Sequence, residues 1–94
     1  MKTSIDVTQT RVFPFKNTKS KVRAFAHIVL NNALRLGGLK VVEGENGLFV
    51  GYPSEKGKDG NFYSIYNPIN RESRSVIQDA VLADYEKAVS AQTA

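Results

Sequence analysis

Apolar and polar residues alternate along the first half of the chain and follow a helical spacing near its end. The clearest alternation runs over residues 21–30, where every second residue from Val22 on is apolar. A period of two is typical of a β-strand with one buried face. Apolar and β-branched runs at residues 3–15, 33–43 and 62–66 predict three further strands.

The strongest local signal is a hairpin in segment 39–54, where two apolar runs flank Gly-Glu-Asn-Gly at residues 44–47. Asn-Gly between β-forming residues favours a hairpin, because a type I′ turn needs a positive φ at both central residues. The second run, residues 48–52, is apolar on both alternating faces, which predicts a strand covered on both sides. Pro53 ends this strand, since proline has no N–H to donate. We expect residues 39–53 to form the central hairpin of the fold.

Turns and loops separate these strands. Asn31 and Asn32 predict a tight turn, because asparagine tolerates a positive φ. Gly37 and Gly38 interrupt a strand and predict a β-bulge or bend. Residues 16–19 and the glycine-rich segment 54–61 are polar, so we expect both to be loops.

The end of the chain predicts an amphipathic helix over residues 71–89. Asn70 is a candidate N-cap, and Glu72 in the first turn suits the helix dipole. Its apolar side has i, i+3/i+4 spacing and consists of Ile77, Ala80, Val81, Tyr85 and Ala88. The side expected to face away carries Arg74, Gln78 and Asp79.

Together these elements predict an α+β fold: about five antiparallel strands joined as a meander of hairpins, with one C-terminal helix. We expect a single domain over residues 1–89 and a frayed tail over residues 90–94. The chain has no cysteine, so disulfides and thiolate metal sites are excluded. Its first residues lack the apolar region of a signal peptide, and no run approaches the roughly 20 apolar residues of a membrane span. We therefore expect a cytoplasmic protein with no membrane partner.

The formal net charge of +4 is unevenly distributed. Between Val7 and Val42 there are seven basic residues and no acidic residue, whereas from Glu43 onward five basic residues accompany eight acidic ones. Such asymmetry indicates a polyanionic partner such as nucleic acid. The same charges also suit a solvated strand face whose lysines discourage aggregation between sheet edges, so charge alone leaves both interpretations open.

The sequence carries no pattern typical of an enzyme. His27 is the only histidine and lies in a predicted strand, without the spaced His, Cys or carboxylate ligands of a metal site. Residues 51–59 differ from a phosphate-binding loop in glycine spacing and in having Asp59 after the lysine. Asp79 and Asp84 are five apart on the predicted helix, so their carboxylates diverge. We expect no catalytic residue, no cofactor, no metal and no small-molecule substrate.

A set of short motifs in fixed order resembles one family. The motifs are Asn46-Gly47-Leu48-Phe49-Val50, Pro53-Ser54, Asp59-Gly60, Pro68-Ile69-Asn70, Arg74, Ile77-Gln78-Asp79-Ala80-Val81-Leu82 and Tyr85. In this order they resemble the stage V sporulation protein G (SpoVG) family, also called the septation protein family. The resemblance implies a homodimeric α+β regulator that binds DNA and RNA, with a role in sporulation and septation. Asn67, where the family usually has histidine, and Val76, where a charged or polar residue is common, depart from the pattern.

The start of the predicted helix is the main candidate site. Arg71 and Arg74 are i, i+3 neighbours beside free N–H groups of the first turn, a combination that suits a phosphate. Ser73 lies between them. Two solvated arginines, one paired with Glu72 or Gln78, would fit the same residues.

Other basic and aromatic residues extend this candidate site. Lys56 and Lys58 in the glycine-rich loop, and Lys21 and Arg23 in the basic half, are further candidate phosphate contacts. Tyr63, Tyr66 and Phe25 are candidates for stacking on bases, although packing in a core is the commoner use of such residues.

One helix covers only one face of a sheet, so we expect a second copy of the chain to cover the remainder as a homodimer. DNA, RNA or both are the expected further partners. The alternatives are a protein-interaction module in cell division or septum control that has no direct nucleic-acid role, and a purely structural dimerisation module.

Overall fold

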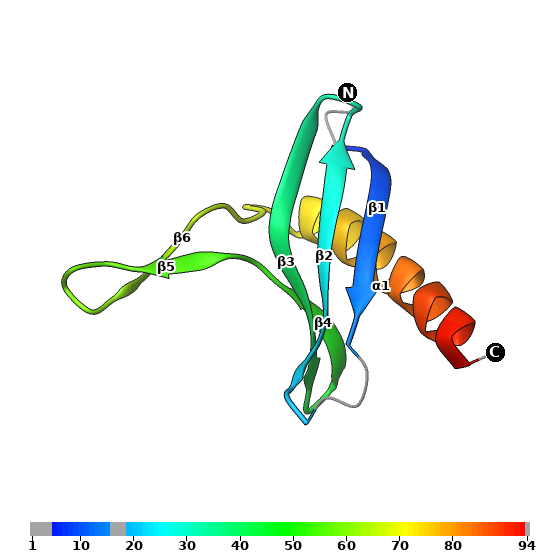
Figure 1. Cartoon of the computed structure of the whole chain (residues 1–94). Helices are drawn as coiled ribbons and strands as arrows, with labels where there is room; N and C mark the ends of the chain where they lie inside the picture. The colour runs from blue at the N-terminus through cyan, green and yellow to red at the C-terminus, as the bar shows by residue number, and fades with distance from the viewer. Residues whose placement is uncertain (1–4, 16–18, 94) are drawn as a thin grey trace.

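The computed structural model describes residues 5–15 and 19–93, with side chains up to Ser90. Strands β1 (Val7–Pro14), β2 (Val22–Leu30), β3 (Leu34–Gly44) and β4 (Gly47–Gly51) form an antiparallel sheet in that order. Strands β5 (Ser54–Lys56) and β6 (Phe62–Ser64) form a separate two-stranded sheet that projects from the body as an arm (Figure 1). Helix α1 (Arg71–Thr93) lies across one face of the larger sheet (Figure 1). The α+β class is confirmed, but the strands divide into four and two instead of forming one sheet of about five.

The core lies between α1 and the larger sheet. Its buried residues are Ala24, Ala26 and Ile28 of β2, Leu39 and Val41 of β3, Val50 of β4, and Ile77 and Val81 of α1. The strand members occupy alternate positions, so they all point to the helix side of the sheet. The alternation predicted over residues 21–30 and the apolar side predicted for the helix are both confirmed. None of the helices in the described part of the chain is long and apolar enough to cross a membrane.

Two backbone features expected from the sequence are present. Asn31 and Asn32 each have a φ of 52°, and they turn the chain between β2 and β3. Gly38 has a φ of 81°, and the register between β2 and β3 shifts at this point. The predicted turn and the predicted bulge are confirmed. The loop predicted at residues 16–19 falls mostly outside the described residues.

The hairpin of β3 and β4 is confirmed, but its predicted place in the fold is wrong. β4 is an edge strand of the larger sheet, and Phe49 on its outer side is 43% exposed. The strand is therefore covered on the helix side only. The turn consists of Glu45 and Asn46, and the positive φ of 119° falls on Gly47 after it. The type I′ turn centred on Asn46 and Gly47 is consequently wrong as well.

β4 ends where the chain turns away into the arm. Pro53 has no N–H for a ladder, and its carbonyl accepts a hydrogen bond of 2.9 Å from the N–H of Ile65. This bond joins the two ends of the arm where it leaves the body. No strand is left to pair with the outer edge of β4 among the described residues, which explains why the predicted central hairpin is peripheral.

The arm corrects two further predictions. Residues 54–61 were expected to form an irregular loop, but Ser54–Lys56 is a strand that pairs with β6. The predicted strand over residues 62–66 is present but ends at Ser64. Every residue of both strands is exposed. A strand without a buried face does not need the alternation of apolar and polar residues from which strands are predicted. The turn between them is closed by a 2.7 Å hydrogen bond from the N–H of Gly57 to the carbonyl of Asn61.

The predicted N-cap of α1 is confirmed. The Oδ1 atom of Asn70 accepts a hydrogen bond of 2.7 Å from the backbone N–H of Ser73. The carbonyl of Asn70 also accepts a 3.2 Å bond from the N–H of Arg74. The helix therefore starts at Arg71, as the sequence indicates.

The rest of α1 differs from the prediction in two respects. The helix continues to Thr93, so the predicted end at residue 89 is wrong; alanines in its last turns favour helical backbone. The fraying of residues 90–94 stays a prediction. Gln78 was expected to face away, but its Oε1 atom accepts a 3.4 Å hydrogen bond from the N–H of Val50. It therefore faces β4, where it binds a backbone group of that edge strand.

Candidate functional site

The start of α1 forms one wall of an open hollow of about 540 Å³. Its lining residues are Asn67, Pro68, Ile69, Asn70, Arg71 and Arg74. The segment before the helix supplies the first four, and the helix supplies both arginines. Because Arg71 and Arg74 are one turn apart and both exposed, their guanidinium groups reach the same opening.

Arg74 rests on an aromatic side chain from another part of the chain. Its Cζ atom lies 5.9 Å from the centre of the Tyr52 ring, a distance typical of a cation–π contact. The Tyr52 hydroxyl is buried and has no hydrogen-bond partner among the described residues. Burial raises the pKa of Tyr52, and the positive charge of Arg74 partly offsets that rise.

A second tyrosine connects this site to β3. The rings of Tyr52 and Tyr66 meet edge to face, with their centres 6.5 Å apart. The Tyr66 hydroxyl donates a hydrogen bond to the carbonyl of Gly37. Burial, with a smaller contribution from Tyr52, raises the pKa of Tyr66 to about 12. Tyr66 is thus a packed and hydrogen-bonded residue, which makes it a poor candidate for stacking on a base.

The charges at this helix start are unusual. Cations in the first turn oppose the helix dipole and cost a few tenths to about 1 kcal/mol each. Neither Arg71 nor Arg74 forms an ion pair with a carboxylate of the described residues. Asn70 already occupies the N–H groups of Ser73 and Arg74, so the N–H groups left for an anion are those of Arg71 and Glu72.

Ser73 lies apart from the two arginines. Its side chain is half-buried and lines a different, mostly apolar hollow of about 300 Å³, together with Leu30, Leu36 and Ile77. The structure therefore joins two of the three candidate residues at the helix start and turns the third toward the sheet.

Lys56 and Lys58 are exposed residues of the arm, which extends away from the helix start (Figure 1). Between the arm's strands, Asp59 accepts a hydrogen bond from the Tyr63 hydroxyl and another of 3.0 Å from the N–H of Asn61. These bonds, that of Tyr63 first, lower the pKa of the Asp59 carboxyl. The arm thus carries acidic as well as basic groups, and Tyr63 is held by one of them.

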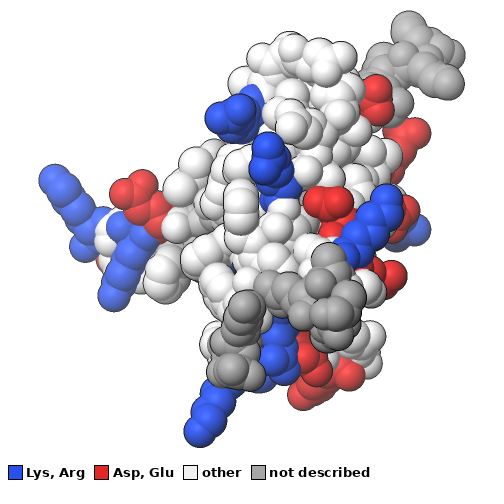
Figure 2. All heavy atoms as spheres, turned by 45° about the vertical axis from the view of Figure 1, so that its right-hand side comes forward, with Lys and Arg blue, Asp and Glu red and all other residues white. Residues whose placement is uncertain are grey.

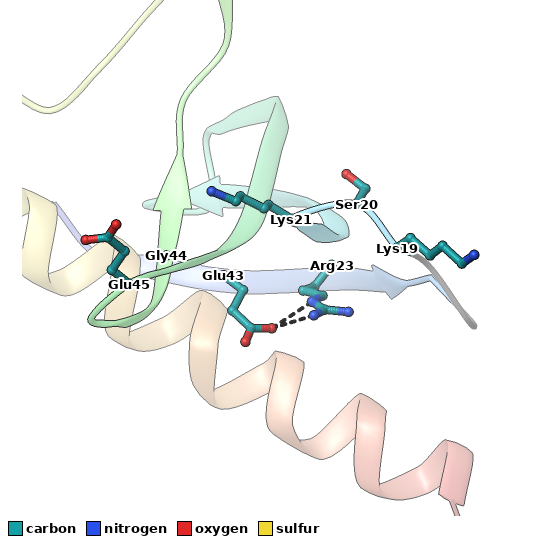
Figure 3. Close-up of a pocket in the computed structure, with 7 residues that line it drawn as sticks. All are labelled: Lys19, Ser20, Lys21, Arg23, Glu43, Gly44 and Glu45. Carbon is teal, nitrogen blue, oxygen red and sulfur yellow. Dashed lines mark hydrogen bonds and ion pairs between the residues drawn. The ribbon is translucent and has the colours of Figure 1, made fainter.

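Lys21 and Arg23 line a third hollow, of about 260 Å³, at the start of β2. Arg23 is paired there with Glu43, with 2.7 Å between Nη2 and Oε1. Figure 3 shows Lys19 and Lys21 extending in opposite directions, while the side chain of Arg23 meets Glu43. The basic groups of this hollow do not converge on one point.

The candidate phosphate contacts therefore occupy three separate places: the helix start, the arm and the start of β2. Figure 2 shows basic and acidic side chains interspersed on one face of the molecule, separated by uncharged surface. At the start of β2, Arg23 is paired with Glu43, whereas neither the helix start nor the arm has an ion pair among the described residues. The helix start differs from the arm because its two cations line one hollow. Phe25, the third stacking candidate, is 48% exposed on the sheet face opposite α1.

Sequence reasoning missed Tyr52 as part of this site. No local spacing relates Tyr52 to Arg74, because the contact depends on how α1 crosses the end of β4. His27 lies in β2 as expected. Within the described ranges, no three His, Cys, Asp or Glu side chains come together in a way that could hold a metal ion.

Comparison with known proteins identifies the family. The SpoVG family profile matches residues 5–87. A protein of Archaeoglobus fulgidus is 43% identical over 82 residues, which cover 87% of this chain and 95% of its own. Proteins of Bdellovibrio bacteriovorus and Oceanobacillus iheyensis are 42% and 47% identical, covering 86% and 77% of this chain and 73% and 75% of their own. All three are named "Putative septation protein SpoVG". The chain belongs to the SpoVG family.

Proposed function

We propose that this protein is a small cytoplasmic regulator that binds DNA, RNA or both as a homodimer, through the start of α1. Arg71 and Arg74 carry this proposal, since they share one open hollow and have no carboxylate partner among the described residues. Both cations oppose the helix dipole, and only Arg74 has an offsetting contact, with the ring of Tyr52. A local cost of this kind is typical of a functional site. The septation named in its relatives is the process in which we place this regulator, together with sporulation.

The chemistry of the hollow favours a phosphate backbone over a small substrate. Guanidinium groups bind phosphate oxygens with two parallel N–H donors, and the N–H groups of Arg71 and Glu72 add donors at the positive end of the helix dipole. The hollow is open, which suits a long polyanion that passes across it. We propose a binding protein without catalytic residues or cofactor.

The arm supports a homodimer. β5 and β6 contact no other helix or strand of the described chain. A two-stranded hairpin is at best marginally stable in water by itself. Yet this arm, and the segment between it and α1, expose large apolar side chains: Phe62 (70%), Tyr63 (54%), Ile65 (60%) and Ile69 (92%). We propose that a second copy of the chain covers these side chains, as apolar surface of this kind marks protein contacts.

Two-fold symmetry would then present two helix starts to one nucleic acid. Each phosphate contact made by one protomer is repeated by its partner, so the number of released counterions doubles. Lys56, Lys58, Lys21 and Arg23 would add weaker contacts, because they lie elsewhere and Arg23 is paired with Glu43.

The exposed apolar arm equally suits an interface with a different protein, which is the second candidate function. The salt dependence of the affinity distinguishes nucleic-acid binding from binding to another protein. We expect the affinity for a fluorescein-labelled DNA duplex or RNA, measured by anisotropy, to fall steeply and log-linearly as salt rises. An undetectable affinity at low salt would contradict nucleic-acid binding and leave protein interaction as the function.

A further inference from the structure

The face of the larger sheet opposite α1 carries an aromatic cluster. The register of β1, β2 and β3 places Phe13 beside Phe25, and Phe25 beside Lys40. In the next row, Arg11 lies beside His27. Phe13 and Phe25 are 51% and 48% exposed, although they are large and apolar. Cross-strand aromatic pairs stabilise a sheet, and a contiguous exposed apolar patch also marks an interaction site.

This cluster surrounds a hollow of about 360 Å³, which we call the aromatic hollow. Its lining residues are Phe13, Phe25, Ala26, His27, Gly37 and Gly38. The bulge at Gly37 and Gly38 lies opposite His27 in the β2–β3 pairing, and neither glycine has a side chain. The hollow thus results from the bulge, which leaves a gap in the row of side chains across the sheet. A Cβ atom added to Gly37 would meet nothing within 4 Å.

The rings around the hollow are supported by one another. Phe13 and His27 meet edge to face, with ring centres 5.6 Å apart and an interplanar angle of 61°. Phe15 meets Phe25 at 4.8 Å and 89°. Such contacts fix ring orientation before a ligand arrives, which lowers the entropic cost of binding.

The charges around the hollow are of one sign. Three exposed cations lie opposite outward-facing residues of β2 in the strand register: Arg11 opposite His27, Arg35 opposite Val29, and Lys40 opposite Phe25. The sequence from Val7 to Val42, which forms β1, β2 and most of β3, contains no acidic residue. Exposed aromatic rings flanked by cations are the combination that binds single-stranded nucleic acid, because rings stack on bases while cations contact phosphates.

We propose that the aromatic hollow takes one unpaired base of a single-stranded nucleic acid, with Arg11 and Lys40 contacting phosphates on either side of it. The inference rests on the proposed function and adds a second site with its own ligand class. Bases inside a duplex are stacked on each other, so their faces are not available to the rings of a sheet. The helix start contacts phosphates in any nucleic acid, whereas the hollow requires an unpaired base.

The test uses a fluorescein-labelled ten-residue oligothymidylate, alone and annealed to its complement. We expect Phe25→Ala to weaken binding of the single strand about 5- to 150-fold, as expected for the loss of one stacked base, and Phe25→Tyr to restore it. Gly37→Leu fills the hollow, and its Cβ meets nothing within 4 Å. We therefore expect it to lower the affinity for the single strand by a similar factor and to leave the affinity for the duplex within about 2-fold of wild type. Phe49→Ala is the matched control, since Phe49 is 43% exposed but does not line the hollow.

A photochemical crosslink locates the base directly. With 5-iodouracil in the single strand, we expect mass spectrometry to find the crosslink on the peptides of Phe13, Phe25 or His27. Two variants are used so that a folding defect in one of them does not decide the result. Unchanged single-strand affinity in both Phe25→Ala and Gly37→Leu would overturn the proposal. So would sedimentation showing that Gly37→Leu separates a dimer, because a second copy would then cover the hollow. If wild type binds neither the single strand nor the duplex at low salt, the proposed function itself fails. If only substitutions of Arg71 and Arg74 lower the affinity, the proposed function stands and the base-binding role of the hollow is wrong.

Discussion

The arm allows a quantitative prediction about the homodimer. Phe62 lies on β6 and Ile65 follows it, with 70% and 60% of their side chains exposed. We consider the double variant Phe62→Ser and Ile65→Ser. Because β5 and β6 contact no other strand or helix of the described chain, these changes should leave the core of one protomer intact.

The magnitude follows from the exposed fractions. Full burial of a phenylalanine or isoleucine side chain contributes about 1.5–3 kcal/mol. Covering the exposed part of Phe62 and of Ile65 therefore contributes about 1–2 kcal/mol each. Two-fold symmetry doubles the sum, to about 4–8 kcal/mol per dimer. Even with half of this surface left uncovered by the partner, the dimer Kd should rise about 30-fold or more.

Sedimentation equilibrium over a range of protein concentrations measures this Kd. Wild type should approach twice the chain mass of 10.4 kDa, and the double variant should move toward that single mass at the same concentrations. Phe49→Ser is the control, because it removes a 43% exposed phenylalanine from β4 instead of the arm. An unchanged Kd in the arm variant would refute the reasoning that the arm forms the interface. A wild type of single mass at tens of micromolar would refute the homodimer.

Three further predictions concern the cap, the arm and the core. Asn70→Ala removes the acceptor of the 2.7 Å bond from Ser73 and should lower the free energy of unfolding by about 0.5–2 kcal/mol in urea denaturation. Tyr63→Phe removes the main cause of the lowered pKa of Asp59, so an NMR titration should find that pKa closer to its ordinary value. Since the folded pKa is the lower one, the arm turn is stabilised above the ordinary pKa of the carboxyl and loses this contribution as pH falls through the folded pKa. Leu39→Ala should cost about 2–5 kcal/mol in urea denaturation, because Leu39 is fully buried.

Each of these has a contrary result. Asn70→Asp keeps an acceptor and should retain most of the stability, so equal losses in both cap variants would show that the bond is unimportant. An unchanged Asp59 pKa in Tyr63→Phe would show that the tyrosine hydroxyl does not bind it. A loss below about 1 kcal/mol for Leu39→Ala would contradict the packing of the core.

Features governed by local chemistry were predictable from the sequence. Asn31 and Asn32 adopt a positive φ because asparagine tolerates it, and the diglycine at residues 37–38 forms a bulge for a similar reason. Asn70 caps α1 through its own side chain. In each case one or two residues determine the conformation, so the sequence states it directly.

Features that depend on distant contacts were not predictable. Ser54–Lys56 is polar, and it becomes a strand only because the turn brings it beside β6. Gln78 bonds the backbone of β4, although its place on the helix suggested the opposite face. Arg74 could be named as a candidate, but its support by Tyr52 depends on the crossing of α1 over the end of β4. The sequence therefore indicated the two arginines of the candidate site, whereas Tyr52 and the geometry of the site depend on the tertiary structure.

The start of α1 is the place where we propose that nucleic acid binds. The most direct test of this proposal is the salt dependence of duplex binding by Arg71→Ala with Arg74→Ala, compared with Lys19→Ala with Lys87→Ala. Both double variants remove two exposed positive charges per protomer, and neither lysine is a proposed contact. The stability of the arginine variant should change little, because the relieved dipole offsets the lost contact with Tyr52.

We expect the arginine variant to lose about 1–3 kcal/mol of binding free energy, with a slope of log affinity against log salt shallower by up to about one unit per lost phosphate contact. The lysine variant should lose clearly less. Equal losses in the two variants would contradict the account, because they would mean that net charge, and not the start of α1, attracts the nucleic acid.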